Sequence, residues 1–388
     1  MDAKRDIAID RLLRTLPASA TGVVVVDLGA IAANWKALQA LVGPAECAAV
    51  VKADAYGLGA ARVVPALAGA GCRTFFVATL DEAIAVRRLA PMATIYVLDG
   101  LARGSGAEVR ASGVRPVISS LPEAREWAGV ARRSGERRAS ALHVDTGLNR
   151  LGLSAPEVAE LVSDGPTIES LDMRVVMSHL ACADDPASPK NAEQRQAFER
   201  IRALLPRTRA SLAASDGLML GKTYHYDLVR PGYALYGGQA FGGGRTPVQA
   251  TVELHVKVLQ VRDVAPGKTV GYAATWHPSR ASRIAVIAAG YADGLFRHLS
   301  RASGEGLASA SVAIRGRLVP IVGRVSMDLV TVDVTDIDGP PVAPGDFVEV
   351  IGPHITIEAR GAAAGTIGYE VLTSLGRRFE RHYVETRS

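Results

Sequence analysis

The 388-residue sequence predicts an α/β fold class, with an N-terminal (β/α)8 barrel followed by a mostly β C-terminal domain. The barrel is predicted because short apolar runs alternate with helical patterns from Gly22 to Tyr236, which is typical of a parallel sheet covered by helices. The second domain is predicted because strand-like segments then follow one another across Pro-Gly and Asp-Gly turns. We therefore expect domains at residues 22–240 and 241–388.

The predicted barrel strands are nine apolar runs of four or five residues. They lie at residues 23–26, 48–51, 74–78, 94–98, 115–118, 141–144, 173–177, 210–213 and 226–229. A closed barrel of this class has eight strands, so the first run can belong elsewhere, and residues of about 10–28 are candidates to pack with the C-terminal domain. Periodicity alone leaves an open, doubly wound sheet as the alternative.

Helix boundaries in the first domain are predicted from capping patterns. Three Ser/Thr-x-x-Glu patterns predict helix starts: Thr79 with Glu82, Ser120 with Glu123 and Ser154 with Glu157. Three glycines near predicted helix ends are expected to adopt the left-handed conformation: Gly71, Gly129 and Gly165.

The second domain is introduced by a glycine-rich stretch at Gly242–Gly244, which predicts a hinge. Its predicted strands lie at residues 252–264, 269–276, 284–289, 312–319, 329–334 and 347–351. Turns such as Pro266-Gly267 separate them, and helical patterns return only from Glu358 and from Tyr369.

Composition excludes several classes of protein. The net charge is +5, but the two signs are interleaved without a basic run that alternates with aromatic residues, so a nucleic-acid site is not expected. The positive excess suits an anionic small molecule. Three cysteines without paired spacing indicate reduced thiols in the cytoplasm. Neither a signal-peptide pattern nor an apolar run of about 18 residues is present in the sequence, so we expect no secretion and no membrane span.

Polar residues follow the predicted barrel strands at their carboxyl ends, where barrels place their chemistry. They are Lys52, Asp145 with Arg150, His179, Ser215 and Arg230. Each has a structural alternative: a surface lysine, a hydrogen-bonded core histidine, a turn-capping serine or an ion-paired arginine. Together they favour an anionic cofactor beside a nucleophilic amine, a description that pyridoxal 5'-phosphate (PLP) meets. No metal is expected.

Eight motifs in chain order make the sequence similar to the alanine racemases, PLP enzymes built from a barrel and a β domain. The motifs are V-V-K-A-D-A-Y-G-L-G from Val50, H-V-D-T-G-L-N-R-L-G-L from His143, M-S-H-L-A-C-A-D-D from Met177, V-R-P-G-Y-A-L-Y-G from Val229, G-Y-A-A-T-W from Gly271, A-G-Y-A-D-G from Ala289, G-R-V-S-M-D from Gly323 and G-T-I-G-Y-E-V-L-T-S-L-G-R-R from Gly365.

The resemblance implies racemisation of alanine by two bases. Lys52 would bind PLP covalently and handle the α-proton of D-alanine, while Tyr272 would act on the opposite face of L-alanine. Spacing alone would make Tyr272 a half-buried strand aromatic. A tyrosine base needs positive charge nearby, and we expect His179 and Arg230 to supply it. Arg230 matches the arginine at the pyridine nitrogen and cannot accept its proton, which favours racemisation over other PLP reactions.

The resemblance also implies the remaining contacts. The residues that match phosphate ligands are Tyr56, Ser215, Gly232, Tyr233 and Tyr369. The residues that match the substrate pocket are Arg150, Tyr291 and Met327. The sequence departs from the family at His143, where many members carry a carbamylated lysine that orients the arginine, so Arg150 must be held otherwise, by Asp145 or by a bound anion. Leu58 and Ala214 also replace a common histidine and a common asparagine.

The resemblance finally implies a homodimer with shared sites, because Lys52 lies in the barrel and Tyr272 in the domain that completes the partner's site. The implied role is supply of D-alanine for peptidoglycan precursors. Three alternatives stay open: a broader amino-acid racemase, a related decarboxylase, which would carry a carboxylate in place of Arg230, and a non-catalytic PLP-binding protein, which would lack the second domain.

Overall fold

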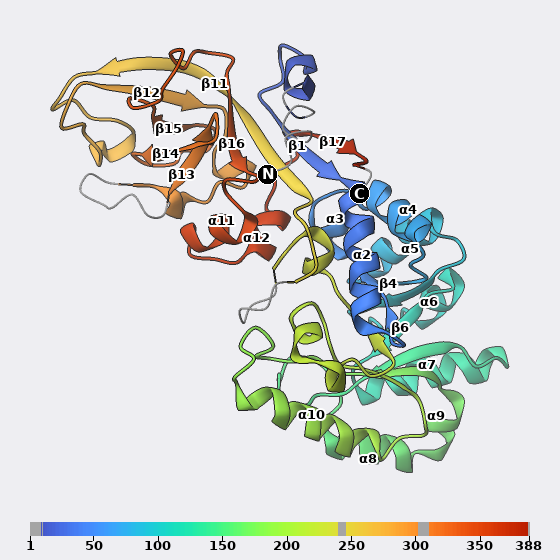
Figure 1. Ribbon diagram of the computed structural model, residues 1–388. Helices are drawn as coiled ribbons and strands as arrows, with labels where there is room; N and C mark the ends of the chain where they lie inside the picture. The colour runs from blue at the N-terminus through green and yellow to red at the C-terminus, as the bar shows by residue number, and fades with distance from the viewer. Residues whose placement is uncertain (1–8, 10, 240–245, 302–309, 387–388) are drawn as a thin grey trace. The chain divides into compact units, whose positions relative to one another are not determined.

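The computed structural model describes residues 9, 11–239, 246–301 and 310–386, and it divides into two compact units. The barrel unit spans Gly29–Gln249. The β unit joins the N-terminal residues through Leu28 to Ala250–Thr386. Figure 1 shows both units. The hinge predicted at Gly242–Gly244 lies outside the described residues.

The barrel unit contains a seven-stranded parallel sheet whose strands follow the chain order. The strands are β3 (Ala49–Val50), β4 (Thr74–Val77), β5 (Thr94–Val97), β6 (Arg115–Ile118), β7 (Ala139–His143), β8 (Asp172–Met177) and β9 (Arg209–Ser211). Most residues in them are buried, as expected for parallel strands covered on both faces, and the less buried ones lie at the starts of the strands.

Two further strands close this sheet into a ring. β10 (Leu228–Val229) pairs in parallel with β2 (Glu46–Cys47), which leads directly into β3. On its other side, Arg230 forms a parallel bridge with Ala214, just beyond β9. The ring confirms the predicted barrel and rules out the open sheet, which periodicity could not do.

Helices separate the strands along the chain and lie around them in Figure 1. They are α2 (Leu28–Val42), α3 (Lys52–Tyr56), α4 (Ala60–Ala70), α5 (Leu80–Leu89), α6 (Gly106–Ser112), α7 (Leu121–Ser134), α8 (Ala155–Ser163), α9 (Gly165–Ser170) and α10 (Pro189–Arg202). Strand and helix alternate as the sequence predicts.

The predicted helix starts are confirmed. Full capping boxes begin α5 at Thr79 and α8 at Ser154, and Ser120 accepts the backbone N–H of Glu123 at the start of α7. Of the predicted ends, Gly71 closes α4 with a φ of 120°.

Two of the predicted helix ends are wrong. Gly129 lies inside α7, because the buried face formed by residues such as Trp127 and Val130 continues past it, and the helix ends at Gly135 instead. Gly165 begins α9 rather than ending α8.

The β unit is an eight-stranded sheet in the order β12-β15-β14-β13-β16-β11-β1-β17. The strands are β1 (Gly22–Asp27), β11 (Val252–Val264), β12 (Ser282–Ile287), β13 (Ser311–Ile314), β14 (Arg317–Val322), β15 (Val330–Asp333), β16 (Phe347–Ile351) and β17 (Glu380–Val384). Two short helices, α11 (Ile357–Ala363) and α12 (Gly368–Thr373), complete it. β1 pairs with β11 and β17, so the first apolar run of the chain belongs to this sheet.

Two strand predictions in this unit need correction. Residues 269–276 form only a bridge between Val270 and Trp276, because Gly271, Ala273 and Ala274 have positive φ and turn the chain through a 3₁₀ helix, η4 (Tyr272–Ala274). Residues 312–319 form a hairpin, with a turn at Arg315 and Gly316, whose φ values are 50° and 78°.

Candidate functional site

The candidate residues of the barrel unit gather at one mouth of the ring. Lys52 follows β3, His179 follows β8, and Arg230 follows β10. Because parallel strands in a barrel end at the same face, these side chains share that face. Their environments are coupled: burial lowers the pKa of His179, and the Arg230, Arg150 and Lys52 cations lower it further. The structure therefore brings together the residues that the sequence places at strand ends.

The lysine is followed by an uncommon backbone conformation. Ala53, Asp54, Ala55 and Tyr56 all have φ values between 53° and 57°, which makes a left-handed turn without glycine. Such a conformation costs roughly 1–2 kcal/mol per residue. The turn places Tyr56 in the barrel interior, where it is 6% exposed, and leaves Lys52 partly exposed at the mouth.

Glu82 holds this turn in place. One of its carboxylate oxygens accepts the backbone N–H of Ala53 at 2.7 Å, and the other accepts that of Ala78 at 2.8 Å. Asp54 adds a bond from within the turn, since its carboxylate accepts the N–H of Ala60 at 2.7 Å. Charge-assisted bonds of this kind offset backbone strain. Glu82 was expected only to cap α5, and nothing in the sequence pattern indicates this second role.

Hydroxyl groups and backbone amides converge beside Tyr56. The Ser215 hydroxyl oxygen accepts the N–H groups of Gly232 and Ala234 at 3.0 and 3.1 Å. A Cβ atom on Gly232 would lie 2.2 Å from the Tyr56 hydroxyl, so only glycine permits this approach. Tyr233 is buried at the start of η3 (Tyr233–Tyr236). This set of neutral donors fits a phosphate group, whose charge converging dipoles can stabilise.

Arg230 is a buried cation that hydrogen-bonds only to neutral groups among the described residues. It is 3% exposed and donates to the Ser211 hydroxyl and to the carbonyls of Ser178 and Leu212, the latter two at 2.7 and 3.4 Å. Burial lowers its pKa to about 10, so it remains a donor at neutral pH. A guanidinium held in this way fits a neutral ring nitrogen that accepts a hydrogen bond, as the PLP pyridine does.

The two histidines at the mouth are neutral near pH 7. Burial, followed by the charges of Arg230 and Arg150, lowers the pKa of His143 to about 4 and that of His179 to about 3. The expectation that His179 supplies positive charge is therefore wrong for this chain, because its neighbours are already cations. Gln194 on α10 fixes the His179 segment: it donates to the His179 carbonyl and accepts the Ala181 N–H, at 3.0 and 2.8 Å.

Arg150 is exposed and has no hydrogen bond or ion pair within the described part of the chain. Asp145 does not hold it. One carboxylate oxygen of Asp145 instead accepts the N–H groups of Gly147, Leu148 and Asn149 at 3.0–3.1 Å, which shapes the loop after β7. Of the two supports expected for Arg150, the structure excludes the ion pair with Asp145 and leaves a bound anion.

The other predicted site residues lie in the β unit, on loops of one neighbourhood. Tyr272, Tyr291 and Met327 are 72%, 43% and 52% exposed. The loops of Tyr291 and Met327 are joined by bonds from the Tyr291 N–H to Ser326 and from the Ala292 N–H to Met327, at 3.1 and 3.0 Å. The Gly271 backbone lies against the segment that begins at Gly323, since a Cβ there would be 3.3 Å from the Arg324 nitrogen. Tyr369 lies in the first turn of α12.

The site residues that sequence reasoning missed are those that orient the others. The Ser211 hydroxyl and the Ser178 carbonyl accept hydrogen bonds from the Arg230 guanidinium. The Tyr236 hydroxyl donates to the carbonyl of Val50, two residues before Lys52, at 3.0 Å. Tyr236 also packs on Tyr56, with ring centroids 4.8 Å apart. Serines at the ends of β8 and β9 were the only available signal, and serine at a strand end usually reads as turn chemistry.

Comparison with known proteins gives a consistent family. The model of the alanine racemase N-terminal domain matches residues 26–240, and that of the C-terminal domain matches residues 251–383. The chain is 49% identical to an alanine racemase of Acidiphilium cryptum over 92% of this chain and 97% of that protein. It is 43% identical to a biosynthetic alanine racemase of Agrobacterium fabrum over 93% of that protein, and 45% identical to a catabolic one of Mesorhizobium japonicum over 94% of that protein.

Solved structures agree. The crystal structure of alanine racemase from Bartonella henselae with covalently bound pyridoxal phosphate superposes with a TM-score of 0.89 at 40% identity, covering 94% of this chain and all of that one. Alanine racemase from Streptomyces coelicolor gives a TM-score of 0.86 at 30% identity, covering 97% of this chain.

Proposed function

Because the chain belongs to the alanine racemase family, we propose that Lys52 and Tyr272 are the two bases with which it interconverts L-alanine and D-alanine. The enzyme is a PLP-dependent racemase, and the cofactor, when bound, makes the α-proton of the amino acid acidic. Lys52 holds the cofactor and moves the proton on one face, and Tyr272 moves it on the other. Racemisation requires a proton donor and acceptor on each face.

The buried Arg230 carries this proposal. A decarboxylase of this fold would place a carboxylate beside the pyridine nitrogen, whereas the acceptors of the Arg230 hydrogen bonds in the described chain are all neutral oxygens. Arg230 would donate a hydrogen bond to the ring nitrogen of the bound cofactor without protonating it, which would make the ring a weaker electron sink and favour return of the proton to the α-carbon. His179, kept neutral by burial and by the Arg230 and Arg150 charges, would not place a second cation beside the bound cofactor.

The remaining contacts follow the site's chemistry. We assign the phosphate to Tyr56, Ser215 and the backbone of Gly232 and Tyr233, which are the neutral polar groups that converge beside Tyr56. Tyr369 is assigned to the phosphate as well. Arg150, Tyr291 and Met327 line the substrate pocket. Arg150 binds the alanine carboxylate, because it is a cation without a carboxylate partner in the described residues.

We further propose that the active unit is a homodimer in which the β unit of one chain completes the barrel mouth of the other. The support is that Tyr272, Tyr291 and Met327 are exposed on one set of loops in a single chain. Clustered exposed aromatic and apolar side chains mark surfaces that a partner covers. Each dimer would then have two shared sites.

The proposed role is supply of D-alanine for peptidoglycan precursors in the cytoplasm. Reduced cysteines support that compartment: Cys47, Cys72 and Cys182 are all free. Among the described residues, no helix has both the length and the apolar character needed to cross a membrane. A catabolic role is the alternative, since both biosynthetic and catabolic enzymes occur among the relatives.

Reduction of the purified enzyme with borohydride tests the central assignment. The reagent should fix the cofactor to Lys52, as located by peptide mass spectrometry, and labelling at any other lysine overturns the assignment. Chiral analysis of products from a panel of L-amino acids then separates an alanine racemase from a broader one. Racemisation of bulky amino acids at a rate close to that of alanine would establish the broader activity.

A further inference from the structure

A polar cavity of about 320 Å³ opens at the mouth of the barrel opposite Lys52. Six of its lining residues are the first residues of their strands: Glu46, Thr74, Thr94, Arg115, Arg209 and Leu228. The candidate catalytic residues instead follow the last residues of the strands. Since the strands are parallel, the two sites lie at opposite ends of the barrel, separated by at least the length of a four-residue strand, on the order of 13 Å.

The cavity carries an excess of positive charge. Four arginines line it, Arg73, Arg115, Arg174 and Arg209, against a single carboxylate, that of Glu46. Arg209 pairs with Glu46 at 2.7 Å, and Arg174 pairs with Asp172 at 2.8 Å.

The other two arginines bind only neutral oxygens in the chain as described. Arg115 donates to the Tyr96 hydroxyl at 3.0 Å, and Arg73 donates to the carbonyls of Ala68 and Cys72 at 3.0 and 3.2 Å. Two guanidinium groups at the cavity therefore have no carboxylate as an ion-pair partner among the described residues.

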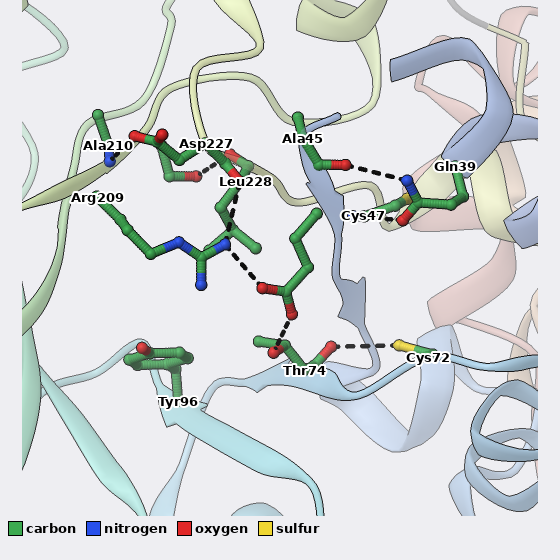
Figure 2. A network of polar contacts seen from close by, with 12 residues as sticks. Gln39, Ala45, Cys47, Cys72, Thr74, Tyr96, Arg209, Ala210, Asp227 and Leu228 are labelled. Atoms are coloured by element: carbon green, nitrogen blue, oxygen red, sulfur yellow. Dashed lines mark hydrogen bonds and ion pairs between the residues drawn. The ribbon is translucent and has the colours of Figure 1, made fainter. Parts of the chain in front are cut away.

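The polar groups around the cavity are held in position. Tyr96 is 2% exposed and stacks on Phe76 with ring centroids 4.8 Å apart. Its hydroxyl fixes Arg115, whose guanidinium carbon lies 5.5 Å from the ring centroid. In Figure 2, dashed lines from Arg209 and Thr74 meet at one carboxylate, and the Glu46 carboxylate accepts a hydrogen bond from each of these two residues. Glu46 is thus already occupied and does not neutralise Arg73 or Arg115.

We propose that this cavity is a binding site for a small anion with two or more negative charges, of the phosphoryl or polycarboxylate class. Arg73 and Arg115 supply the charge, because guanidinium groups match the paired oxygens of such anions. Thr94 and the Tyr96 hydroxyl add neutral polar groups. The size of the cavity suits a low-molecular-weight ligand. This site is separate from the one assigned to the cofactor, and it does not depend on the proposed catalytic roles.

Calorimetric titration of the PLP-loaded enzyme with pyrophosphate, and separately with citrate, tests the proposal. The bound cofactor blocks its own phosphate site, and saturating alanine blocks Arg150. We expect one saturable site per chain, and the probe that binds more tightly identifies the class of anion. Arg115→Gln and Arg73→Gln should each weaken binding about tenfold, the usual loss for one charge-assisted hydrogen bond. Arg133→Gln, which removes an exposed arginine on α7 outside this cavity, is the matched control and should bind as the unaltered enzyme does.

The absence of saturable binding at millimolar concentrations of both probes overturns the proposal. So does binding that Arg73→Gln and Arg115→Gln leave unchanged, since the anion would then bind elsewhere. Circular dichroism and racemase activity report whether each variant is folded. If Arg115→Gln fails to fold, Arg73→Gln carries the same test, because Arg73 is exposed and its loss removes no buried contact.

Discussion

Tyr272 is assigned a demanding role for a side chain that is 72% exposed in the single chain. A free tyrosine has a pKa of about 10, so a tyrosine base requires cations in its surroundings. His179 cannot be one of them, because its lowered pKa keeps it neutral. Apart from Lys52, which is assigned to hold the cofactor, Arg150 and Arg230 are the cations at the barrel mouth, and Arg150 is the more exposed of the two and has no ion pair in the described chain.

Tyr272→Phe should therefore reduce turnover of L-alanine by about 10²- to 10⁴-fold, the usual contribution of a general base. Cofactor absorbance should be retained, because Tyr272 is not among the residues assigned to hold PLP. Initial rates from L-alanine and from D-alanine, measured with chiral detection, check this. Tyr224→Phe is the control for loss of a tyrosine hydroxyl outside the assigned site, and equal rates for the two variants would remove Tyr272 as a base.

His143 should make stability depend on pH. Its pKa is lowered to about 4 in the folded chain, whereas an unfolded histidine has a pKa of about 6.5. The contribution of neutral His143 to the unfolding free energy is therefore fully present above pH 6.5. It is lost as the pH falls toward 4, because the unfolded chain then binds a proton that the folded chain does not. The slope approaches about 1.4 kcal/mol per pH unit within that window.

His143→Asn should remove that slope while the contribution of His179 remains. Urea unfolding of the cofactor-free protein at several pH values between 4 and 7 measures it. The matched control is His298→Asn, a substitution at an exposed histidine of the β unit. An acid-dependent loss of stability that is identical in the unaltered protein and in His143→Asn would contradict the assignment.

At the scale of elements, the left-handed turn after Lys52 depends on a residue from another helix. Glu82→Gln keeps the size of the side chain but replaces one carboxylate oxygen with an amide NH₂, which cannot accept the N–H of Ala53 or Ala78. We expect a loss of about 1–3 kcal/mol in unfolding free energy and weaker PLP binding, because the turn positions both Lys52 and Tyr56. Chemical denaturation and titration of the apoenzyme with PLP measure the two effects.

The control for this experiment is Glu157→Gln. Glu157 occupies the same position in the capping box of α8, where, among the residues that the structure describes, its carboxylate accepts hydrogen bonds from Ser154 alone. Glu157→Gln should lower the unfolding free energy by about 1 kcal/mol, the usual contribution of a helix cap, and should leave PLP affinity unchanged. Equal PLP affinity in the two variants would show that Glu82 does no more than cap its helix.

This turn is also a feature that the sequence did not predict, in contrast to the helix caps. The capping pairs were predictable because each is a contact between residues three apart in the chain. The left-handed turn was not, because Ala53, Asp54 and Ala55 prefer other conformations and the acceptor of the Ala53 N–H is a carboxylate 29 positions away. The error at residues 269–276 has a related cause: alternating apolar residues suggested a strand, whereas positive φ at Gly271 and Ala273 makes a turn that exposes Tyr272.

At the scale of the whole chain, periodicity predicted the strands but not their partners. β1 has the apolar pattern of a barrel strand, yet it lies between β11 and β17, more than 200 residues away in sequence. The β unit is thus built from both ends of the chain. Register and pairing over such distances are set by tertiary packing, which one sequence does not reveal. The ring closure between β10 and β2 was expected only from the count of apolar runs.

The exposure of Tyr272, Tyr291 and Met327 makes a prediction about assembly. If the β unit of one chain completes the barrel mouth of another, Lys52 and Tyr272 of one active site come from different chains. Lys52→Ala and Tyr272→Phe subunits should then complement each other. A mixed dimer has one site with both substitutions and one site with neither.

Equal amounts of the two inactive variants, dissociated together and reassembled, should therefore recover about a quarter of wild-type activity, since half of the dimers are mixed and each has one intact site. Distinct affinity tags on the two variants allow the mixed dimer to be purified, and its specific activity should be about half that of the wild-type enzyme. Each variant taken alone through the same treatment is the control. A mixed dimer confirmed by both tags but lacking racemase activity would place both bases in one chain, because only a site shared between chains restores the pair.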